Sequence, residues 1–267
     1  MDKKTFDTFR DLIYDKAGIN INGNKVALVA ARVGKRMREL SITEHREYLE
    51  FVFNDHHSGE LVHLLDAIST NVTSFFREGT HFDFFGSLME QWRDSGQKKY
   101  RFWSAASSTG EEPYSMAMVI LDKLGKAVSD VKILATDLST KVLARCAEGV
   151  YTKEKTAPVP PSKLDKYFEK RSMSKRTCFA VRQEVKNLIT FSRLNLSKPP
   201  FPMNGPFDAV FCRNVMIYFD NTVRKNLLDE IFRLLKPGGY LFVGHAESLT
   251  GILSGFKAVQ PSVYCKP

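Results

Sequence analysis

The sequence lacks several features that mark specialised classes of protein. No run of apolar residues approaches the roughly 18 that a membrane span needs, and the polar, amphipathic start predicts no signal peptide. The four cysteines lie far apart and form no Cys-x-x-Cys pair, which favours free thiols in a reducing cytoplasm and no zinc site. With 43% hydrophobic and 26% charged residues, we expect a globular cytoplasmic protein.

The loop after residues 102–104 is poor in glycine and carries acids. Residues 102–111 have the pattern of a buried strand, a tight loop of small residues and a helix start, which form a nucleotide-binding corner in α/β folds. Gly110 is the one glycine, and the carboxylates of Glu111 and Glu112 would repel a pyrophosphate. The loop instead suits a ligand with hydroxyls and a positive centre, such as S-adenosylmethionine.

The charge is strongly unbalanced. A formal net charge of +9 over 267 residues favours an acidic partner, which could be nucleic acid, a membrane surface or an acidic protein. Solubility alone would explain the charge equally well. The length allows one large domain or two modest ones.

The first quarter of the chain has only helical patterns. Phe6, Phe9 and Ile13 recur at the spacing of one helix face, and a second apolar stripe runs from Val26 to Leu40. We expect an all-helical domain over residues 1–68. A polar connector over residues 69–80 follows, well placed to contact a ligand bound by the next domain.

Strand and helix patterns alternate over residues 81–267. This alternation predicts an α/β fold, a doubly wound and mostly parallel sheet. Residues 151–193 interrupt it with prolines, a basic run and short alternating segments, which predict an inserted β-subdomain. The expected strands are 100–104, 132–136, 207–212 and 240–244, and the expected helices are 113–124, 140–146 and 222–235.

Asp137 follows the second expected strand of the sheet. An acid at this position can accept hydrogen bonds from the two ribose hydroxyls of a nucleoside. Alternatively, Asp137 or Ser139 could cap the next helix. We favour the ribose role because the loop at 104–111 lies one strand earlier.

Two further groups of polar residues are candidates for the site. In the connector, Arg77 could pair with a ligand carboxylate while Asn71 and Thr73 add hydrogen bonds, or the segment could be only a capped turn. Arg213 and Asn214 fall at a strand tip, where ligands bind in doubly wound sheets, and Tyr218 follows them with a hydroxyl and a ring edge. From spacing alone, that segment could equally be a plain strand-to-helix turn.

A stretch of fourteen residues without an acid forms a candidate docking surface. Lys25, Arg32 and Arg36 share one helical face, and Lys35 lies nearby. The alternatives are docking of an acidic partner helix and a merely solvated face. Elsewhere, His245 and Glu247 follow a strand, but no further ligand is spaced to join them in a metal site, so we expect no metal and a supporting role for both.

Four motifs together resemble the CheR family of chemotaxis receptor methyltransferases. The resemblance covers nearly the whole chain, including the helical start and the β insertion. The four occur in the family's order: STNVTSFFRE at 69–78, WSAASSTGEEPYS at 103–115, FCRNVMIYFD at 211–220 and LKPGG at 235–239.

The resemblance implies a Rossmann-like methyltransferase domain that moves a methyl group from S-adenosylmethionine to glutamate side chains of chemoreceptors. The products would be a glutamate methyl ester and S-adenosylhomocysteine. The resemblance also implies an arginine near the transferred methyl group, and Arg93 matches that position less closely than the other residues match theirs. Tyr218 is our own candidate for lining the acceptor side. The implied cofactor contacts are Asn71, Thr73, Arg77, Glu111, Asp137, Asn195, Leu196, Arg213 and Asn214.

The chemistry is consistent with these residues. A glutamate carboxylate has an unperturbed pKa of ~4.3, so it is already a nucleophile at neutral pH and needs no catalytic base. Receptor methylation regions in this family are helical bundles rich in glutamate, which the face with Lys25, Arg32, Lys35 and Arg36 would attract. We expect a monomer that binds no nucleic acid and reaches the membrane only through its receptor.

Some questions stay open at this point. Family members that capture a receptor tail peptide carry glycines in one loop of the insertion, and residues 170–175 have none here, so we expect no dependence on a tail peptide. A nucleic-acid methyltransferase is one alternative, although residues 213–216 do not supply the expected clamp for a flipped base. A catalytically silent module that binds the cofactor and signals through a partner is the other.

Overall fold

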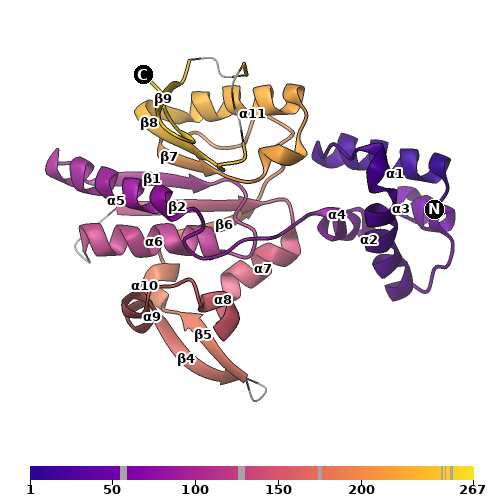
Figure 1. The fold of residues 1–267 in the computed structure, drawn as a ribbon, viewed down its shortest axis with the longest axis horizontal. Coiled ribbons are helices and arrows are strands. Elements are labelled where there is room, and N and C mark those ends of the chain that lie inside the picture. Colours follow the sequence, from indigo (N-terminus) through magenta and orange to yellow (C-terminus); the bar gives the residue numbers. More distant parts are fainter. Residues whose placement is uncertain (55–58, 126–129, 174–175, 248, 250, 253–254) are drawn as a thin grey trace.

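The computed structural model of the chain describes all residues except 55–58, 126–129, 174–175, 248, 250 and 253–254. It shows a helical domain joined by a single connector to an α/β domain, and a small β-subdomain projects from the latter (Figure 1). The expected fold class is therefore confirmed.

The helical domain contains α1 (Lys3–Ala17), α2 (Val26–Glu39), α3 (His45–Asn54) and α4 (Glu60–Ile68). The Asp2 side chain caps the start of α1 by accepting from Thr5 N, and Gly18, with a φ of 68°, ends it. One apolar face of each helix meets the others in a common core, where Phe9, Val33 and Leu64 are fully buried.

The main sheet has seven strands in the order β6-β2-β1-β7-β8-β10-β9. The first five are parallel, and β10 is antiparallel to both of its neighbours, β8 and β9. After β1, the chain forms β2 and β6 on one side of β1 and then crosses to form β7 on the other side. A topological switch point therefore lies between β1 and β7. The strands are β1 (Lys99–Ser104), β2 (Asp130–Asp137), β6 (Ile189–Arg193), β7 (Phe207–Cys212), β8 (Leu235–Val243), β9 (Lys257–Gln260) and β10 (Val263–Cys265).

Both faces of this sheet are covered, as a doubly wound fold requires. Alternate residues of β1 point to opposite faces, so Phe102 joins one core and Trp103 the other. The Phe102 core is shared with α5 (Gly79–Asp94) and α6 (Glu111–Leu124), while α11 (Asn221–Leu234) packs on the Trp103 side. These two cores hold the strand tips, and the loops that follow them, in fixed positions.

The inserted subdomain is a three-stranded sheet in the order β3-β5-β4. Its strands are β3 (Val150–Thr152), β4 (Phe168–Met173) and β5 (Arg176–Val181), accompanied by the short helices α8 (Lys153–Thr156), α9 (Pro161–Tyr167) and α10 (Gln183–Lys186). The insertion ends earlier than the expected residue 193, because β6 pairs with β2 in the main sheet. Part of the loop at 170–175 lies outside the described residues.

Most predicted elements appear within a few residues of their expected bounds, including α7 (Thr140–Glu148) after β2. Two differences stand out. The sequence pattern did not predict α5, and Leu235, expected to be the last residue of the final helix, begins β8. The helix ends instead at Leu234, whose successor already has an extended backbone.

Candidate cofactor-binding site

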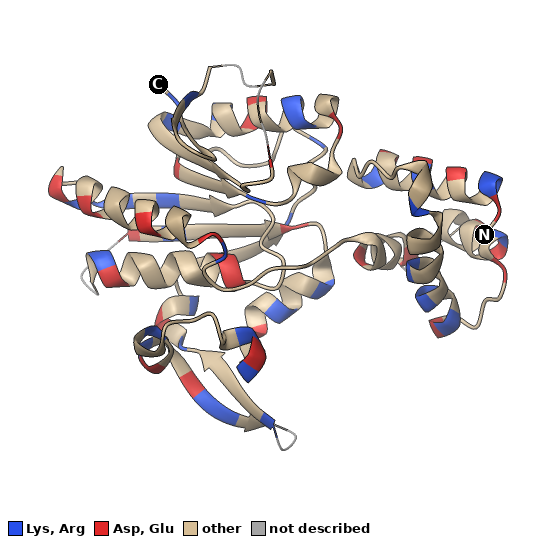
Figure 2. Ribbon diagram, viewed as in Figure 1, with Lys and Arg blue, Asp and Glu red and all other residues tan. Residues whose placement is uncertain are grey.

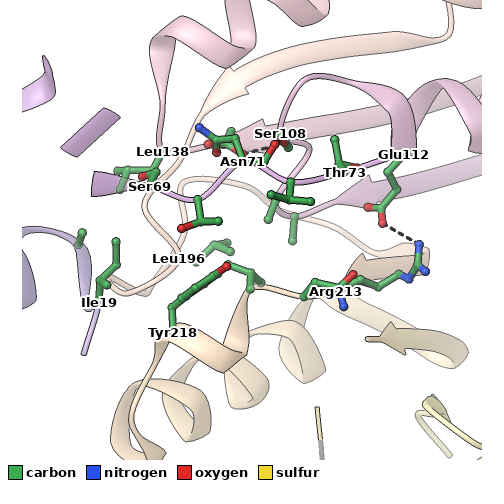
Figure 3. Close-up of a pocket in the computed structure, with 18 of the residues that line it drawn as sticks. Ile19, Ser69, Asn71, Thr73, Ser108, Glu112, Leu138, Leu196, Arg213 and Tyr218 are labelled. Carbon is green, nitrogen blue, oxygen red and sulfur yellow. Dashed lines mark hydrogen bonds and ion pairs between the residues drawn. The ribbon is translucent and has the colours of Figure 1, made fainter. Parts of the chain in front are cut away.

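A cavity lies at the switch point, where the carboxyl ends of β1, β2 and β7 meet the connector. Its empty volume is about 970 Å³, which includes space open to solvent. Figure 3 shows Asn71 and Thr73 of the connector on one side and Arg213 and Tyr218 on the other. Ligands bind at this position in open α/β sheets, so this pocket is the candidate site.

Asp137 lies at the tip of β2 and lines the pocket. Its two carboxylate oxygens accept the N–H groups of Ser108 and Ser139, each at 2.9 Å. The alternative capping role belongs to Ser139, whose side chain accepts from Val142 N at the start of α7. Each oxygen of Asp137 retains acceptor capacity, so the side chain can still receive hydroxyl groups from a ligand.

The loop after β1 has the tight geometry that its small residues predict. Ser108 and Gly110 both have a positive φ, of 48° and 97°. A Cβ on Gly110 would lie 2.8 Å from the Tyr151 hydroxyl, so glycine is required there. This turn brings Ser108 to the pocket wall and starts α6 directly behind it.

The two neighbouring acids of this loop have different surroundings. Glu112 lines the pocket and accepts from Ser104 Oγ at 2.8 Å and from Arg213 at 3.0 Å. Glu111, the acid expected to contact the cofactor, does not line the pocket and is fully buried. Its carboxylate accepts from Lys155 Nζ at 3.0 Å and from Thr109 Oγ1 at 2.6 Å.

The connector supplies the wall opposite β7, as expected. Asn71, Thr73 and Arg77 all line the pocket. The Asn71 carbonyl accepts from Ser108 Oγ at 3.2 Å, and Arg77 Nη1 donates to Val72 O at 3.0 Å. These contacts hold the connector against the loop after β1 and leave its polar side chains beside the cavity.

Arg213, at the tip of β7, is 5% exposed and binds two carboxylates. It donates to Glu112 at 3.0 Å and to Glu78 at 2.9 Å, which ties the connector, α6 and β7 together. Burial opposes ionisation of Glu78, but Arg213 outweighs it and holds the pKa of that carboxyl below its ordinary value. Burial dominates at Glu112 and raises its pKa, although Arg213 and Ser104 lower it in part.

The helical domain closes the remaining side of the pocket. Ala17 and Ile19 contribute to the lining, beside Asn195, Leu196 and Tyr218. The backbone N–H of Asn20 donates to Tyr218 O at 2.8 Å, and Asn195 Nδ2 donates to Lys16 O at 2.6 Å. The start of the chain is therefore attached to the turn that carries Tyr218.

Arg93 does not join these residues. It lies in the last turn of α5, next to the amino end of β1, whereas the pocket lies at the carboxyl ends of the strands. Its side chain is exposed, donates to Lys123 O at 3.0 Å and pairs with Asp94 at 2.9 Å. The structure gives no support for a role of Arg93 near the methyl group, so we do not retain it.

The four cations of the expected docking surface separate into two pairs. Arg32 donates to Ile68 O and to Thr70 Oγ1, and Arg36 pairs with Glu60, at 2.7 Å, and with Glu39. Lys25 and Lys35 are exposed, as is Arg38, and Figure 2 shows the basic residues along α2. The arginine pair therefore holds the helical domain together, and the lysines face solvent.

One group of residues missed by the sequence could in principle hold a cation. Glu78, His81 and His245 offer ligand atoms within 4.8 Å of one another. However, Arg213 already donates to the same Glu78 oxygen that faces the histidines. Its fixed positive charge opposes a metal ion at that point, and we propose none.

The residues around the pocket fit S-adenosylmethionine. Asp137 offers acceptors to ribose hydroxyls, and the acid Glu112 suits a positively charged group. Arg77 is the cation available to a ligand carboxylate, and the side chains of Leu138 and Leu196 give an apolar surface to a base.

Comparison with known proteins agrees with this geometry. Residues 71–265 match the family described as CheR methyltransferase, SAM binding domain, and residues 4–69 match CheR methyltransferase, all-alpha domain. A chemotaxis protein methyltransferase of Escherichia coli is 40% identical over 97% of this chain and 89% of its own. One from Borreliella burgdorferi is 36% identical over 96% of this chain and 91% of its own.

Likeness to solved structures is weaker. A glycopeptide N-methyltransferase complexed with sinefungin aligns with a TM-score of 0.35 and 18% identity, over 66% of this chain and 55% of its own, which adds nothing to the assignment. No helix among the described residues combines the length and apolar character that crossing a membrane requires. The two family matches and the curated relatives show that the chain belongs to the CheR family of S-adenosylmethionine-dependent methyltransferases of chemotaxis.

Proposed function

We propose that this pocket binds S-adenosylmethionine and that the enzyme methylates glutamate side chains of chemoreceptors, giving methyl esters and S-adenosylhomocysteine. The observation that carries the proposal is the meeting of Asp137, the connector and the loop after β7 around one cavity at the switch point. When bound, the cofactor supplies the methyl group on a sulfonium. The protein binds it, orients the acceptor and excludes water.

Each wall of the pocket has a distinct part in holding the cofactor. Asp137 receives the ribose hydroxyls, and Arg77, with Asn71 and Thr73, binds the amino-acid end. The further contacts that we propose are Asn195, Leu196, Arg213, Asn214 and also Glu112, all of which line the pocket. Glu111 supports this wall from behind, because Lys155 Nζ, its partner, also lies 3.4 Å from Thr73 O.

Tyr218 marks the acceptor side. It lines the cofactor pocket and also a second groove, which lies beside α2 and includes Lys25, Leu28 and Arg32. The two hollows share Ile19, Ile68 and Thr70 as well. The groove is therefore a route by which a side chain of a receptor helix reaches the cofactor, with the Tyr218 hydroxyl positioned to hold the acceptor carboxylate.

The reaction requires alignment more than acid–base chemistry. A glutamate carboxylate with a pKa of ~4.3 is ionised at neutral pH and attacks without a general base. Holding the carboxylate, methyl carbon and sulfur in line supplies the rate enhancement. Burial of the pocket by the connector and helical domain excludes the water that would compete.

Receptor docking falls to the exposed cations of the helical domain. Lys25, at the start of α2, borders the acceptor groove, while Lys35 and Arg38 lie further along the helix. A glutamate-rich helical bundle is the complementary surface. The enzyme acts as a monomer and meets the membrane only through this receptor.

The test is transfer of labelled methyl from S-adenosylmethionine to a purified chemoreceptor cytoplasmic fragment, followed by base treatment. Release of the label by base would support a carboxyl methyl ester. Base-stable label would contradict glutamate as the acceptor, and cofactor binding without transfer would favour the silent module.

A further inference from the structure

Glu247 is a buried carboxylate that does not line the pocket but binds the turn after β7, part of which does. The residue follows β8 and is 3% exposed. Its oxygens accept three backbone N–H groups, from Gly244 at 2.6 Å, Met216 at 2.7 Å and Asn214 at 2.8 Å. Among the hydrogen bonds and ion pairs of the described residues, none joins Glu247 to a Lys or Arg.

Two of these N–H groups belong to the turn that carries the candidate site residues. Asn214 follows Arg213 and has a φ of 58°, in the left-handed region. Met216 begins the short 3₁₀ turn Met216–Tyr218, whose first N–H groups have no partner within the turn. The carboxylate therefore accepts the N–H group of the left-handed residue Asn214 and the first N–H group of the turn that carries Tyr218.

We propose that Glu247 is a positioning residue that fixes the turn at 213–218, and with it Tyr218 and the Arg213–Asn214 pair, against the pocket. The proposal rests on the proposed function for its effect on turnover. A carboxylate is suited to this place because it is acceptor-only. Glutamine would turn an NH₂ group towards backbone N–H groups and lose at least one of the three bonds.

Gly244 is part of the same arrangement. A Cβ at residue 244 would lie 2.3 Å from Asn214 Nδ2 and 2.9 Å from Glu247 Oε2. A methyl group there would displace the side chains of Asn214 and Glu247 from these positions. Gly244→Ala therefore disturbs the same contacts as Glu247→Gln by an independent route.

Glu230 provides a matched control. It is likewise buried, at 7% exposed, and accepts a backbone N–H, from Phe201 at 2.7 Å. It lies on α11, pairs with Arg233 at its own helix surface and does not line the pocket. Glu230→Gln therefore reports what loss of a buried carboxylate does to the fold alone.

The first experiment is calorimetric titration of S-adenosylhomocysteine into the full-length protein and its variants. We expect binding to weaken about tenfold in Glu247→Gln and in Gly244→Ala, and less than twofold in Glu230→Gln. Unchanged affinity in both Glu247→Gln and Gly244→Ala would overturn the proposal. This titration needs no receptor, so it decides the proposal even if no receptor fragment is methylated and the proposed function fails.

The second experiment separates positioning from general destabilisation. We compare kcat for receptor methylation in Glu247→Gln, Tyr218→Phe and the double variant. If Glu247 acts through the turn, its loss lowers kcat about tenfold in the native background but less than threefold beside Tyr218→Phe. Equal losses in both backgrounds would show that Glu247 does not act through Tyr218 and would contradict that part of the proposal.

Discussion

Each domain of the molecule contains an arginine that bridges two carboxylates: Arg36, which is partly buried, in the helical domain and Arg213, which is buried, in the α/β domain. Arg36 of α2 pairs with Glu60 of α4 and with Glu39, and the Tyr48 hydroxyl also donates to Glu60 at 2.6 Å. Arg213 pairs with Glu112 and Glu78. The chemistry is the same, but Arg213 lines the candidate cofactor pocket and Arg36 does not. A buried ion pair is thus no sign of function by itself, and its place at the carboxyl ends of parallel strands decides its role.

Replacement of each arginine by methionine is the sharpest test of this difference. Arg213→Met leaves two carboxylates buried without their cation, so we expect a loss of about 3–5 kcal/mol in unfolding free energy together with loss of cofactor binding. Arg36→Met should cost about 2 kcal/mol, because its side chain is 17% exposed, and leave cofactor affinity unchanged. Urea unfolding and calorimetry with S-adenosylhomocysteine measure the two effects. Equal cofactor affinity in both variants would break the comparison.

Asp137, which lines the pocket, and Ser139, which does not, allow the same comparison between a binding and a structural residue. Under the proposed ribose role, Asp137→Ala would remove two charge-assisted hydrogen bonds to the ligand, so we expect affinity for S-adenosylhomocysteine to fall about 100-fold. Ser139→Ala removes the cap of α7 and costs about 1 kcal/mol of stability, with little effect on binding. A comparable loss of affinity in the two variants would argue that Asp137 is only part of the helix start.

His81 lies beside the Arg213 ion pairs and makes the stability of the protein depend on pH. Burial, and then the charge of Arg213, lower the pKa of His81 to about 4. Because the unfolded chain has a histidine pKa of about 6.5, it binds the proton first, and native stability falls as pH drops from about 6.5 to about 4.

We expect the lowered pKa of His81 to reduce the free energy of unfolding by about 2 kcal/mol between pH 7 and pH 5. His81→Phe should remove that part of the slope in urea unfolding curves recorded at both pH values. An unaltered slope in the variant would mean that other groups cause it.

The exposed cations of α2 should give the smallest effect. Lys35→Glu with Arg38→Glu is expected to raise KM for a receptor fragment about tenfold at low salt, and much less at high salt, because surface attraction is screened. Cofactor affinity and stability should not change. Arg36→Met is the matched control on the same helix, since it breaks an internal pair. If the two substitutions leave KM unchanged, the receptor binds a surface other than this face of α2.

The sequence predicted the fold well because the signals are local and periodic. The strand 207–212 was placed at its observed bounds, since an unbroken apolar run between turn residues admits few other structures. The rule that ligands bind at strand tips made Asp137 and the turn at 213–218 candidates for the site. Spacing alone left a plain turn as an alternative for that segment and a capped turn for Asn71, and the family resemblance favoured the site in both cases.

What the sequence could not decide was the direction of single side chains. Glu111 and Glu112 are adjacent and chemically alike, and only the helix phase turns Glu112 to the pocket and Glu111 to Lys155. The same limit applies to Arg36, whose partner Glu60 is on another helix. Glu247 lies more than thirty residues beyond two of its three partners, Asn214 and Met216, and no motif spacing signals those contacts.

The most direct test of this account is an experimental structure of the protein with S-adenosylhomocysteine. The account predicts that the ligand occupies the pocket between the connector and the turn at 213–218, with its two ribose hydroxyls in hydrogen-bond distance of Asp137. Glu112 would face the ligand and Glu111 would stay with Lys155. A ligand bound elsewhere, with Asp137 contacting only Ser108 and Ser139, would contradict the account.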